Sequence, residues 1–304
     1  SKISEYWSDY AQFLETSTRT DKEKNNSVNH FWIIDKKKRD LDLHFWAINY
    51  IQKNKNIYKT REEMNKNIRL ASQEKNSPFE GTRALLFSQL LGFYERENWD
   101  KTSEVFDYLN KNQNKKDKII NNQMEKLFYW NDIHSRINRH ANTYIIPKED
   151  IFNVYTCLFI YQVFEKLYSL GERTILTKFE FLYFISFVRK HEELDDVVER
   201  ILLYRNYEEK FELEKFLKFV TKSRPKEEKY QIFDTRYYEI FKYLTYFNYS
   251  NDALILKDEC REIVFDKVQN FNYLLLNKNI IIQKNYNDYK KLLYSKKSLF
   301  EFFK

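Results

Sequence analysis

The stretch GTRALLFSQLLGFYERENW (Gly81–Trp99) closely parallels the stretch DTRYYEIFKYLTYFNYSND (Asp234–Asp252). Aligned on Arg83 and Arg236, both open with a residue suited to capping a helix and then a Thr-Arg pair. Each continues with an apolar stripe at helical spacing, followed by an aromatic pair and a polar turn. The pattern predicts, in both halves of the chain, a helix that runs directly into a β-hairpin.

A helix that opens with Thr-Arg and leads into a hairpin is typical of winged-helix proteins, in which the first helical turn approaches the DNA bases. We therefore predict a mainly α fold with small β-hairpins, built as two winged-helix (helix-turn-helix) subdomains joined by a linker. The polar run NKNQNKKDKIINNQ, from Asn110, has little apolar content and is the best candidate for that linker. The predicted divisions are an N-terminal arm (1–30), a first winged-helix subdomain (31–112), a linker (113–145), a second winged-helix subdomain (146–270) and a C-terminal extension (271–304).

The composition is that of a folded, basic chain. Of 304 residues, 42% are hydrophobic and 18% are aromatic, which allows a sizeable core. Gly and Pro occur three times each, so turn-rich sandwiches and barrels are disfavoured, and no glycine-rich phosphate loop is present in the sequence. The formal net charge of +7 is compatible with a polyanionic partner.

Cysteine usage and hydropathy predict a cytoplasmic, bacterial protein without a membrane segment. Cys157 and Cys260 are distant in sequence, which favours a reducing compartment over a disulfide framework. The longest nearly charge-free apolar run, Ile151–Phe164, is shorter than the roughly 20 residues that a membrane-spanning helix needs. The frequent use of Lys, Asn, Ile and Tyr is typical of a bacterial genome rich in A·T codons.

Local signals place the main helices of the second half. The run Ile151–Leu170 is apolar almost all round, which predicts a buried central helix that ends at Gly171. Thr177 and Glu180 form a capping box, which predicts a helix over 178–189.

The two Thr-Arg helices supply the candidate base contacts. The planar fork of Arg matches O6 and N7 of guanine, and each Arg lies in the first turn of its predicted helix. The Thr residues would cap these helices or contact a phosphate or a thymine methyl group. The alternative for each Arg is a surface salt bridge, and several tyrosines of the second helix are expected in the core. The candidate base contacts are Arg83, Arg236, Thr82, Thr235 and Tyr237.

Basic residues elsewhere are candidates for contacts with the DNA backbone. Four consecutive cations lie between two aromatic-rich stretches, and the segment 131–144 is rich in Arg and His. A solvated loop is the alternative for the cation run. The candidate backbone contacts are Lys36, Lys37, Lys38, Arg39, Arg96, Arg136, Arg139 and Lys242.

No catalytic or metal-binding motif is evident in the sequence. The triplet E-x-K, which one class of metal-dependent nucleases carries on a strand, occurs at Glu208–Lys210 and Glu227–Lys229. Both triplets lie in charged sequence without an apolar strand, and no zinc-ligand spacing is present. We therefore predict neither a metal nor a cofactor in this chain, and we expect it to bind DNA without cutting it.

The pattern resembles the recognition region of Type IIS restriction and nicking endonucleases of the AlwI and BpuJI kind. TRALLFSQLLGFYERENWDKTSEVFDYL is similar to the first winged helix of that family, and HFWIIDKKKRD to the tryptophan-led arm before it. ILTKFEFLYFISFVRKHEELDDVVERILLYRN is similar to the helix pair that opens the second winged helix, and TRYYEIFKYLTYFNYSNDALILKDECREIV to its recognition helix and wing. The likeness covers most of residues 30–270.

The resemblance implies recognition of a short asymmetric site in double-stranded DNA. In that family a separate C-terminal nuclease domain makes the cut, and Mg²⁺ is expected only there. The sequence reaches Lys304 without a nuclease motif. The expected partners are therefore double-stranded DNA and either a C-terminal nuclease domain or a separate cleavage subunit.

Two other classes of protein stay open. A helical RNA-binding or ribonuclease-like defence protein would lack the hairpins after Leu91 and Leu244 and would prefer structured RNA. A protein-interaction scaffold would explain the aromatic residues and the core, but not the paired Thr-Arg helices.

Overall fold

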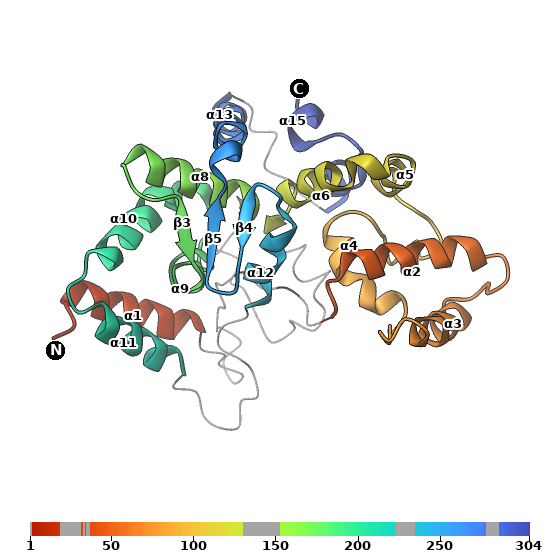
Figure 1. Cartoon of the computed structure of the whole chain (residues 1–304), viewed down its shortest axis with the longest axis horizontal. Helices are drawn as coiled ribbons and strands as arrows, with labels where there is room; N and C mark the ends of the chain where they lie inside the picture. Colours follow the sequence, from red (N-terminus) through yellow and green to blue (C-terminus); the bar gives the residue numbers. More distant parts are fainter. Residues whose placement is uncertain are drawn as a thin grey trace. The chain divides into compact units, whose positions relative to one another are not determined.

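The computed structural model describes residues 2–18, 32, 34, 37–129, 153–222, 235–277 and 286–304. These residues form a mainly helical protein with two small antiparallel sheets, which confirms the predicted fold class at this level (Figure 1). The chain divides into two compact units. Unit 1 comprises Ser1–Ile34 and Phe128–Asn272, and unit 2 comprises Asp35–Leu127 and Tyr273–Lys304.

Unit 1 surrounds one central helix with further helices and both sheets. Its elements are α1 (Glu5–Thr18), β1 (Phe128–Tyr129), β2 (Val154–Tyr155), α8 (Thr156–Ser169), β3 (Ile175–Thr177), α9 (Lys178–Glu180), the π-helix η4 (Phe181–Ile185), η5 (His191–Glu193), α10 (Leu194–Arg205), α11 (Lys210–Lys222), α12 (Arg236–Glu239), the 3₁₀ helix η6 (Ile240–Tyr243), β4 (Phe247–Tyr249), β5 (Ala253–Leu256), η7 (Asp258–Cys260) and α13 (Arg261–Asn277).

The central helix of unit 1 is α8, as its apolar sequence predicts. Residues 156–164 are all buried, and the helix ends with Gly171 in the left-handed region at φ 76°. Glu172 N donates to Leu167 O at 2.9 Å, which closes the helix end in the way expected of a C′ glycine. This predicted helix end is therefore confirmed.

A three-stranded antiparallel sheet covers one side of α8, with the strand order β3–β5–β4. Leu176 pairs with Leu254, and Phe247 pairs with Leu256, so the buried side chains of the three strands share one face. The Phe247 ring lies 5.1 Å from the Phe164 ring of α8 between centroids, which joins the sheet to the helix.

The regular elements that the structure describes in unit 2 are all helices. Its elements are α2 (Leu41–Asn54), α3 (Arg61–Gln73), the 3₁₀ helix η1 (Thr82–Leu85), α4 (Leu86–Leu90), α5 (Glu104–Lys111), η2 (Gln113–Lys115), α6 (Lys116–Glu125), α14 (Tyr286–Tyr294) and α15 (Leu299–Phe302).

The polar run predicted as a linker instead begins a packed helix, α6. Gln123 is buried and its Nε2 donates at 2.7 Å both to Leu91 O and to Leu293 O. Ile119, Ile120 and Met124 are buried beside it. A buried side-chain amide that donates to backbone carbonyls can occupy a core position. The polar composition of the run therefore does not reveal that it packs in the core.

The hairpin predicted after Leu91 is not formed, and this prediction was wrong. After α4 the chain turns at Gly92, with φ 76°, and passes through turns rather than strands. A Cβ at Gly92 would lie 2.2 Å from Leu293 O, so this glycine allows α14 to approach the turn closely. Phe93 and Tyr94 are fully buried, and the apolar signal there belongs to the helical core.

Candidate nucleic-acid interface

The second Thr-Arg stretch forms a short helix and a hairpin in unit 1. Helix α12 continues as η6 and ends at Tyr243. Strands β4 and β5 then form the predicted hairpin, in which Ser250 N donates to Ala253 O at 3.0 Å across the turn. The hairpin prediction after Leu244 is confirmed.

The hairpin tip is tied to both neighbouring helices. Tyr238, on α12, donates its hydroxyl hydrogen to Ser250 O at 2.7 Å. Lys178, on α9, donates from its backbone N to Asp252 O at 2.8 Å and from Nζ to Asn251 Oδ1 at 2.9 Å. The position of the tip is therefore set by α12 and α9 together.

Arg236 lies at the start of α12 and is partly exposed. Its Nη1 donates to Ile34 O at 3.3 Å, which orients the guanidinium. Glu239, one turn later, is partly exposed, and Lys242, on η6, is exposed. These three residues occur at intervals of three and therefore line one side of the short helix.

Thr235 does not cap α12 through its side chain. Its φ and ψ are −76° and −9°, already in the helical region, and its hydroxyl donates to Glu239 Oε1 at 3.1 Å. The predicted capping role was wrong, because the helical turn begins at Thr235 itself.

Tyr237 is not available to a base, so this predicted contact was wrong. The side chain is buried, and its hydroxyl lies 2.7 Å from Thr156 Oγ1 at the start of α8. Burial raises the pKa of the Tyr237 phenol well above its usual value. The ring packs against Trp32, with centroids 5.4 Å apart. Tyr237 therefore holds α12 to the core.

Replacing Tyr237 with Phe should test this structural role. The substitution removes the hydroxyl partner of buried Thr156 and is expected to lower the free energy of unfolding by about 1–3 kcal/mol. Urea unfolding measures this loss, and an unchanged free energy of unfolding would contradict the structural role of the Tyr237 hydroxyl.

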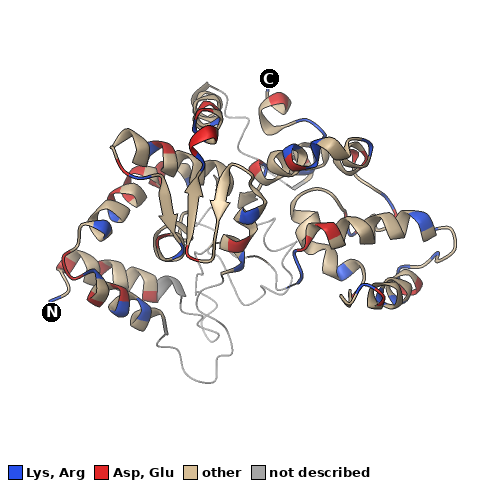
Figure 2. Cartoon of the chain, in the orientation of Figure 1, with Lys and Arg blue, Asp and Glu red and all other residues tan. Residues whose placement is uncertain are grey.

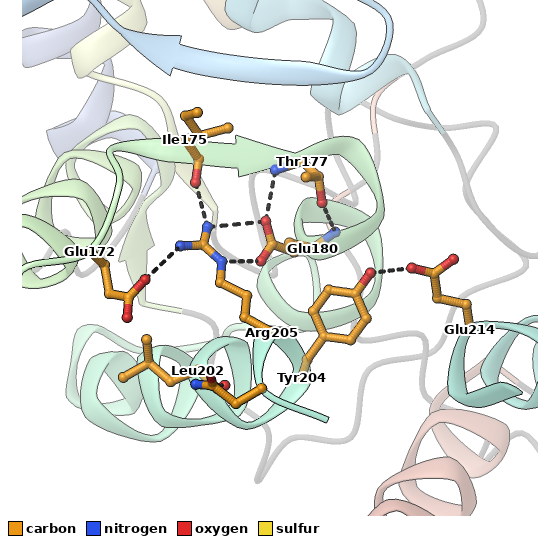
Figure 3. A network of polar contacts seen from close by, with 9 residues as sticks. Glu172, Ile175, Thr177, Glu180, Leu202, Tyr204, Arg205 and Glu214 are labelled. Carbon is orange, nitrogen blue, oxygen red and sulfur yellow. Dashed lines mark hydrogen bonds and ion pairs between the residues drawn. The ribbon is translucent and has the colours of Figure 1, made fainter. Parts of the chain in front are cut away.

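A buried ion pair supports the strand next to the hairpin (Figure 3). The side chain of Glu180 is 1% exposed, and Arg205 Nε donates to Glu180 Oε2 at 2.7 Å. Arg205 Nη2 donates to Ile175 O at 2.5 Å, and Thr177 N donates to Glu180 Oε1 at 2.9 Å. Ile175 pairs with Ile255 of β5, so Arg205 anchors β3 and, through β3, the hairpin.

The first Thr-Arg stretch has a different structure in unit 2. Thr82 is fully buried within η1 and its backbone N donates to Asn65 Oδ1 at 2.9 Å. Its predicted role in base contact was therefore wrong. Arg83 is exposed and stays a candidate. Gly81 adopts φ 89° and, if it had a Cβ, would contact Asn65 at 2.5 Å, so the turn before η1 requires glycine.

The cation run has structural partners in unit 2. Lys37 pairs with Glu80, and Lys38 Nζ donates to Ser77 Oγ at 3.0 Å. Arg39 Nη1 donates to Lys37 O at 3.0 Å. Lys38 is exposed, whereas Lys37, Arg39 and Arg96 are partly exposed. Lys36, Arg136 and Arg139 lie outside the described residues, as does the E-x-K triplet at Glu227–Lys229.

Two histidines that the sequence does not single out, half-buried His191 and fully buried His44, contact their surroundings in the neutral form. In unit 1, His191 Nε2 accepts from Tyr155 N at 3.0 Å and Nδ1 faces Gln162 Oε1 at 2.7 Å. In unit 2, His44 Nδ1 lies 2.7 Å from Ser88 Oγ. Burial lowers the pKa of His191 to about 3 and the pKa of His44 to about 4.

Charge and metal chemistry do not single out a catalytic centre in the described part of the chain. Figure 2 shows Lys and Arg interspersed with Asp and Glu along the helices. The triplet Glu208–Lys210 lies in the turn that leads into α11 rather than on a strand. Among the described residues, no group of three or more His, Cys, Asp or Glu could hold a metal ion, and no helix is long and apolar enough to cross a membrane.

Comparison of the sequence with models of known protein families and with curated proteins finds no match. The arrangement of side chains is therefore the basis for assigning a function.

Proposed function

We propose that this chain binds double-stranded DNA at a short specific sequence, with unit 1 acting as a winged helix. In this proposal α12 and η6 form the recognition helix and β4–β5 forms the wing. The observation that carries it is the order helix α8, strand β3, helix α9–η4, helix α12–η6 and hairpin β4–β5, with β3 paired to β5.

Contacts between the second and third helices support this proposal. The Phe181 ring of η4 lies 5.3 Å from the Tyr238 ring and 5.4 Å from the Phe241 ring between centroids. Such packing lets one helix support another whose outer side is available to a groove. Helices α10 and α11 are then an insertion between the second and third helices of the motif.

The short recognition helix carries both kinds of contact that DNA recognition requires. Arg236 at its first turn suits the guanine edge, and Lys242 suits a phosphate. Because Tyr237 and Tyr238 are buried, few side chains of the recognition helix are available to contact bases. We propose that unit 1 reads a few base pairs and that exposed Arg83 of unit 2 contributes more weakly to recognition.

The proposed site is asymmetric. Dimeric helix-turn-helix proteins match palindromic sites through their own two-fold symmetry. Here the winged-helix order belongs to unit 1, while the described residues of unit 2 are helical without a strand. Because the two units differ, the chain suits an asymmetric DNA site, as in the Type IIS endonucleases that its amino-acid sequence resembles. On that likeness we also propose that cleavage is supplied by a nuclease domain or by a separate subunit.

Arg236→Ala should lose preferred-site binding by about 1–3 kcal/mol, which corresponds to roughly 5- to 150-fold. Non-specific affinity should change little, because only a base contact is removed. Selection from randomised duplexes should show relaxed preference at one or two base pairs, and titration of the selected duplex should give the affinity loss.

Lys242→Ala is the matched control on the same short helix. It should weaken binding to all duplex sequences alike and flatten the dependence of log K on log salt by roughly 0.9. A uniform loss for Arg236→Ala as well would make that arginine a phosphate contact. Unchanged duplex binding in both variants, or preference of the parent chain for structured RNA, would overturn the proposed function.

A further inference from the structure

A second feature of unit 1 lies apart from the proposed DNA contacts. Helices α1 and α10 and the segment after η4 enclose a cleft of about 390 Å³. Its walls include the aromatic residues Tyr10, Phe13 and Phe187, and the guanidinium groups of Arg189 and Arg200 contribute positive charge. A cleft of this size accommodates a small organic molecule.

Arg200 makes this cleft chemically unusual. Its guanidinium carbon lies 4.3 Å from the centroid of the Tyr10 ring, and its Nε is buried without a hydrogen-bond acceptor among the described residues. Within the same residues, no carboxylate forms an ion pair with it. An arginine keeps its charge at any physiological pH, so a partly buried guanidinium favours an anionic partner.

The carboxylates at the cleft do not supply that partner. Glu193 Oε2 accepts hydrogen bonds from the backbone N of Arg189 at 2.6 Å and of Lys190 at 2.7 Å, which orient it toward the backbone. Asp9 is exposed. The Arg200 guanidinium also contacts the Tyr10 hydroxyl, and its remaining N–H groups line the cleft where a carboxylate or a phosphate would approach.

The aromatic walls suggest the rest of the ligand. The rings of Tyr10 and Phe13 are 5.8 Å apart at an interplanar angle of 27°, and Phe13 is 39% exposed. The Phe187 ring lies 6.0 Å from that of Phe13. The partly exposed Phe13 ring, in the same cleft as a guanidinium, suits a flat apolar group that carries a negative charge.

We propose that the cleft between α1 and α10 binds a small aromatic anion, with Arg200 binding the carboxylate or phosphate and Phe13 contacting the ring. This site does not depend on the proposed DNA binding, because none of its residues belongs to α12 or to the hairpin.

Calorimetric titration of the full chain with four probes tests the site. Benzoate and phenyl phosphate carry both the ring and the charge, and they distinguish a carboxylate ligand from a phosphate ligand. Benzyl alcohol lacks the charge, and inorganic phosphate lacks the ring. We expect saturable binding of at least one ring-bearing anion, at least about tenfold tighter than either incomplete probe.

Variants of the cleft residues test which side chain contacts which part of the ligand. Arg200→Gln should weaken binding of the ring-bearing anion at least about tenfold, and Phe13→Ala should weaken it while leaving inorganic phosphate unaffected. Arg173→Gln, at an exposed arginine that does not line the cleft, should bind as the parent does. If circular dichroism shows that Arg200→Gln is unfolded, Arg200→Lys is used in its place. Lysine keeps the positive charge but lacks the planar guanidinium, so this variant should also bind the ring-bearing anion more weakly.

Absence of saturable binding to both ring-bearing anions would overturn the proposal, as would equal binding by the parent and the folded Arg200 variant. The proposal would also be overturned if the parent bound neither ring-bearing probe and Arg200→Gln lost duplex binding. Arg200 would then be a contact to the DNA phosphates.

Discussion

Arg205→Met is expected to lower the free energy of unfolding of unit 1 by about 3–5 kcal/mol. The substitution leaves the Glu180 carboxylate buried without its ion-pair partner and removes the hydrogen bond to Ile175 O. Removing one partner of a buried pair costs more than the pair itself contributes, because an uncompensated charge stays in a region of low dielectric constant. Urea unfolding, with hydrogen exchange to report unit 1 separately, measures this loss.

The control is an exposed ion pair of the same unit. Lys166 Nζ lies 3.4 Å from Asp195 Oδ1, and the two side chains are 42% and 81% exposed. Lys166→Met should therefore change the free energy of unfolding by no more than about 1 kcal/mol. Glu180→Leu combined with Arg205→Met should recover part of the loss, because no buried charge is left. Equal effects of Arg205→Met and Lys166→Met would show that the buried position of the Glu180 pair has no energetic consequence.

Acidification should destabilise unit 1 through His191 and unit 2 through His44. An unfolded histidine has a pKa near 6.5, whereas the folded pKa is about 3 for His191 and about 4 for His44. Below pH 6.5 the unfolded chain therefore binds protons that the folded chain excludes. The stabilisation is fully present above pH 6.5 and is lost as the pH falls toward the folded pKa, by about 1.4 kcal/mol per pH unit for each histidine.

Each histidine should thus cost about 2 kcal/mol between pH 6.5 and pH 5. His191→Gln keeps a donor and an acceptor but cannot titrate, so it should flatten the pH dependence of unit 1 alone. His44→Gln should do the same for unit 2. Denaturant unfolding at several pH values, with hydrogen exchange in peptides of each unit, measures both slopes. An unchanged slope in both variants would show that folding does not lower the pKa of either histidine.

Prediction from the sequence was successful where local chemistry alone decides the structure. Gly171 ends α8 because a left-handed residue at that position favours glycine, and the alternating residues around Ser250–Asp252 form the hairpin. The capping box of Thr177 and Glu180 is also present, although the helix that it opens soon becomes a π-helix. Such signals depend on neighbours in sequence and do not need the tertiary structure.

Prediction from the sequence failed where distant segments of the chain determine the local structure. The aromatic pair Phe93–Tyr94 reads like the start of a strand, but both side chains are buried in a helical unit and the chain turns beside Leu293. Gln123 reads as solvent-exposed, but its partners are carbonyls from two other segments. Tyr237 reads as a possible DNA contact, and only the position of Thr156 shows that it faces the core. None of these partners can be identified from local periodicity.

The course of the chain through the two units has a consequence for synthesis. The chain passes from one unit to the other at 34–35, at 127–128 and at 272–273, so each unit is assembled from two separate segments. Residues 35–127 leave the ribosome long before α14, whose Leu293 carbonyl completes the contacts of Gln123 and lies beside Gly92. Unit 1 has all its residues by position 272, and unit 2 does not. Residues 35–127, which are made before most of unit 1, therefore belong to the unit that is completed last, and no single cut in the chain releases either unit whole.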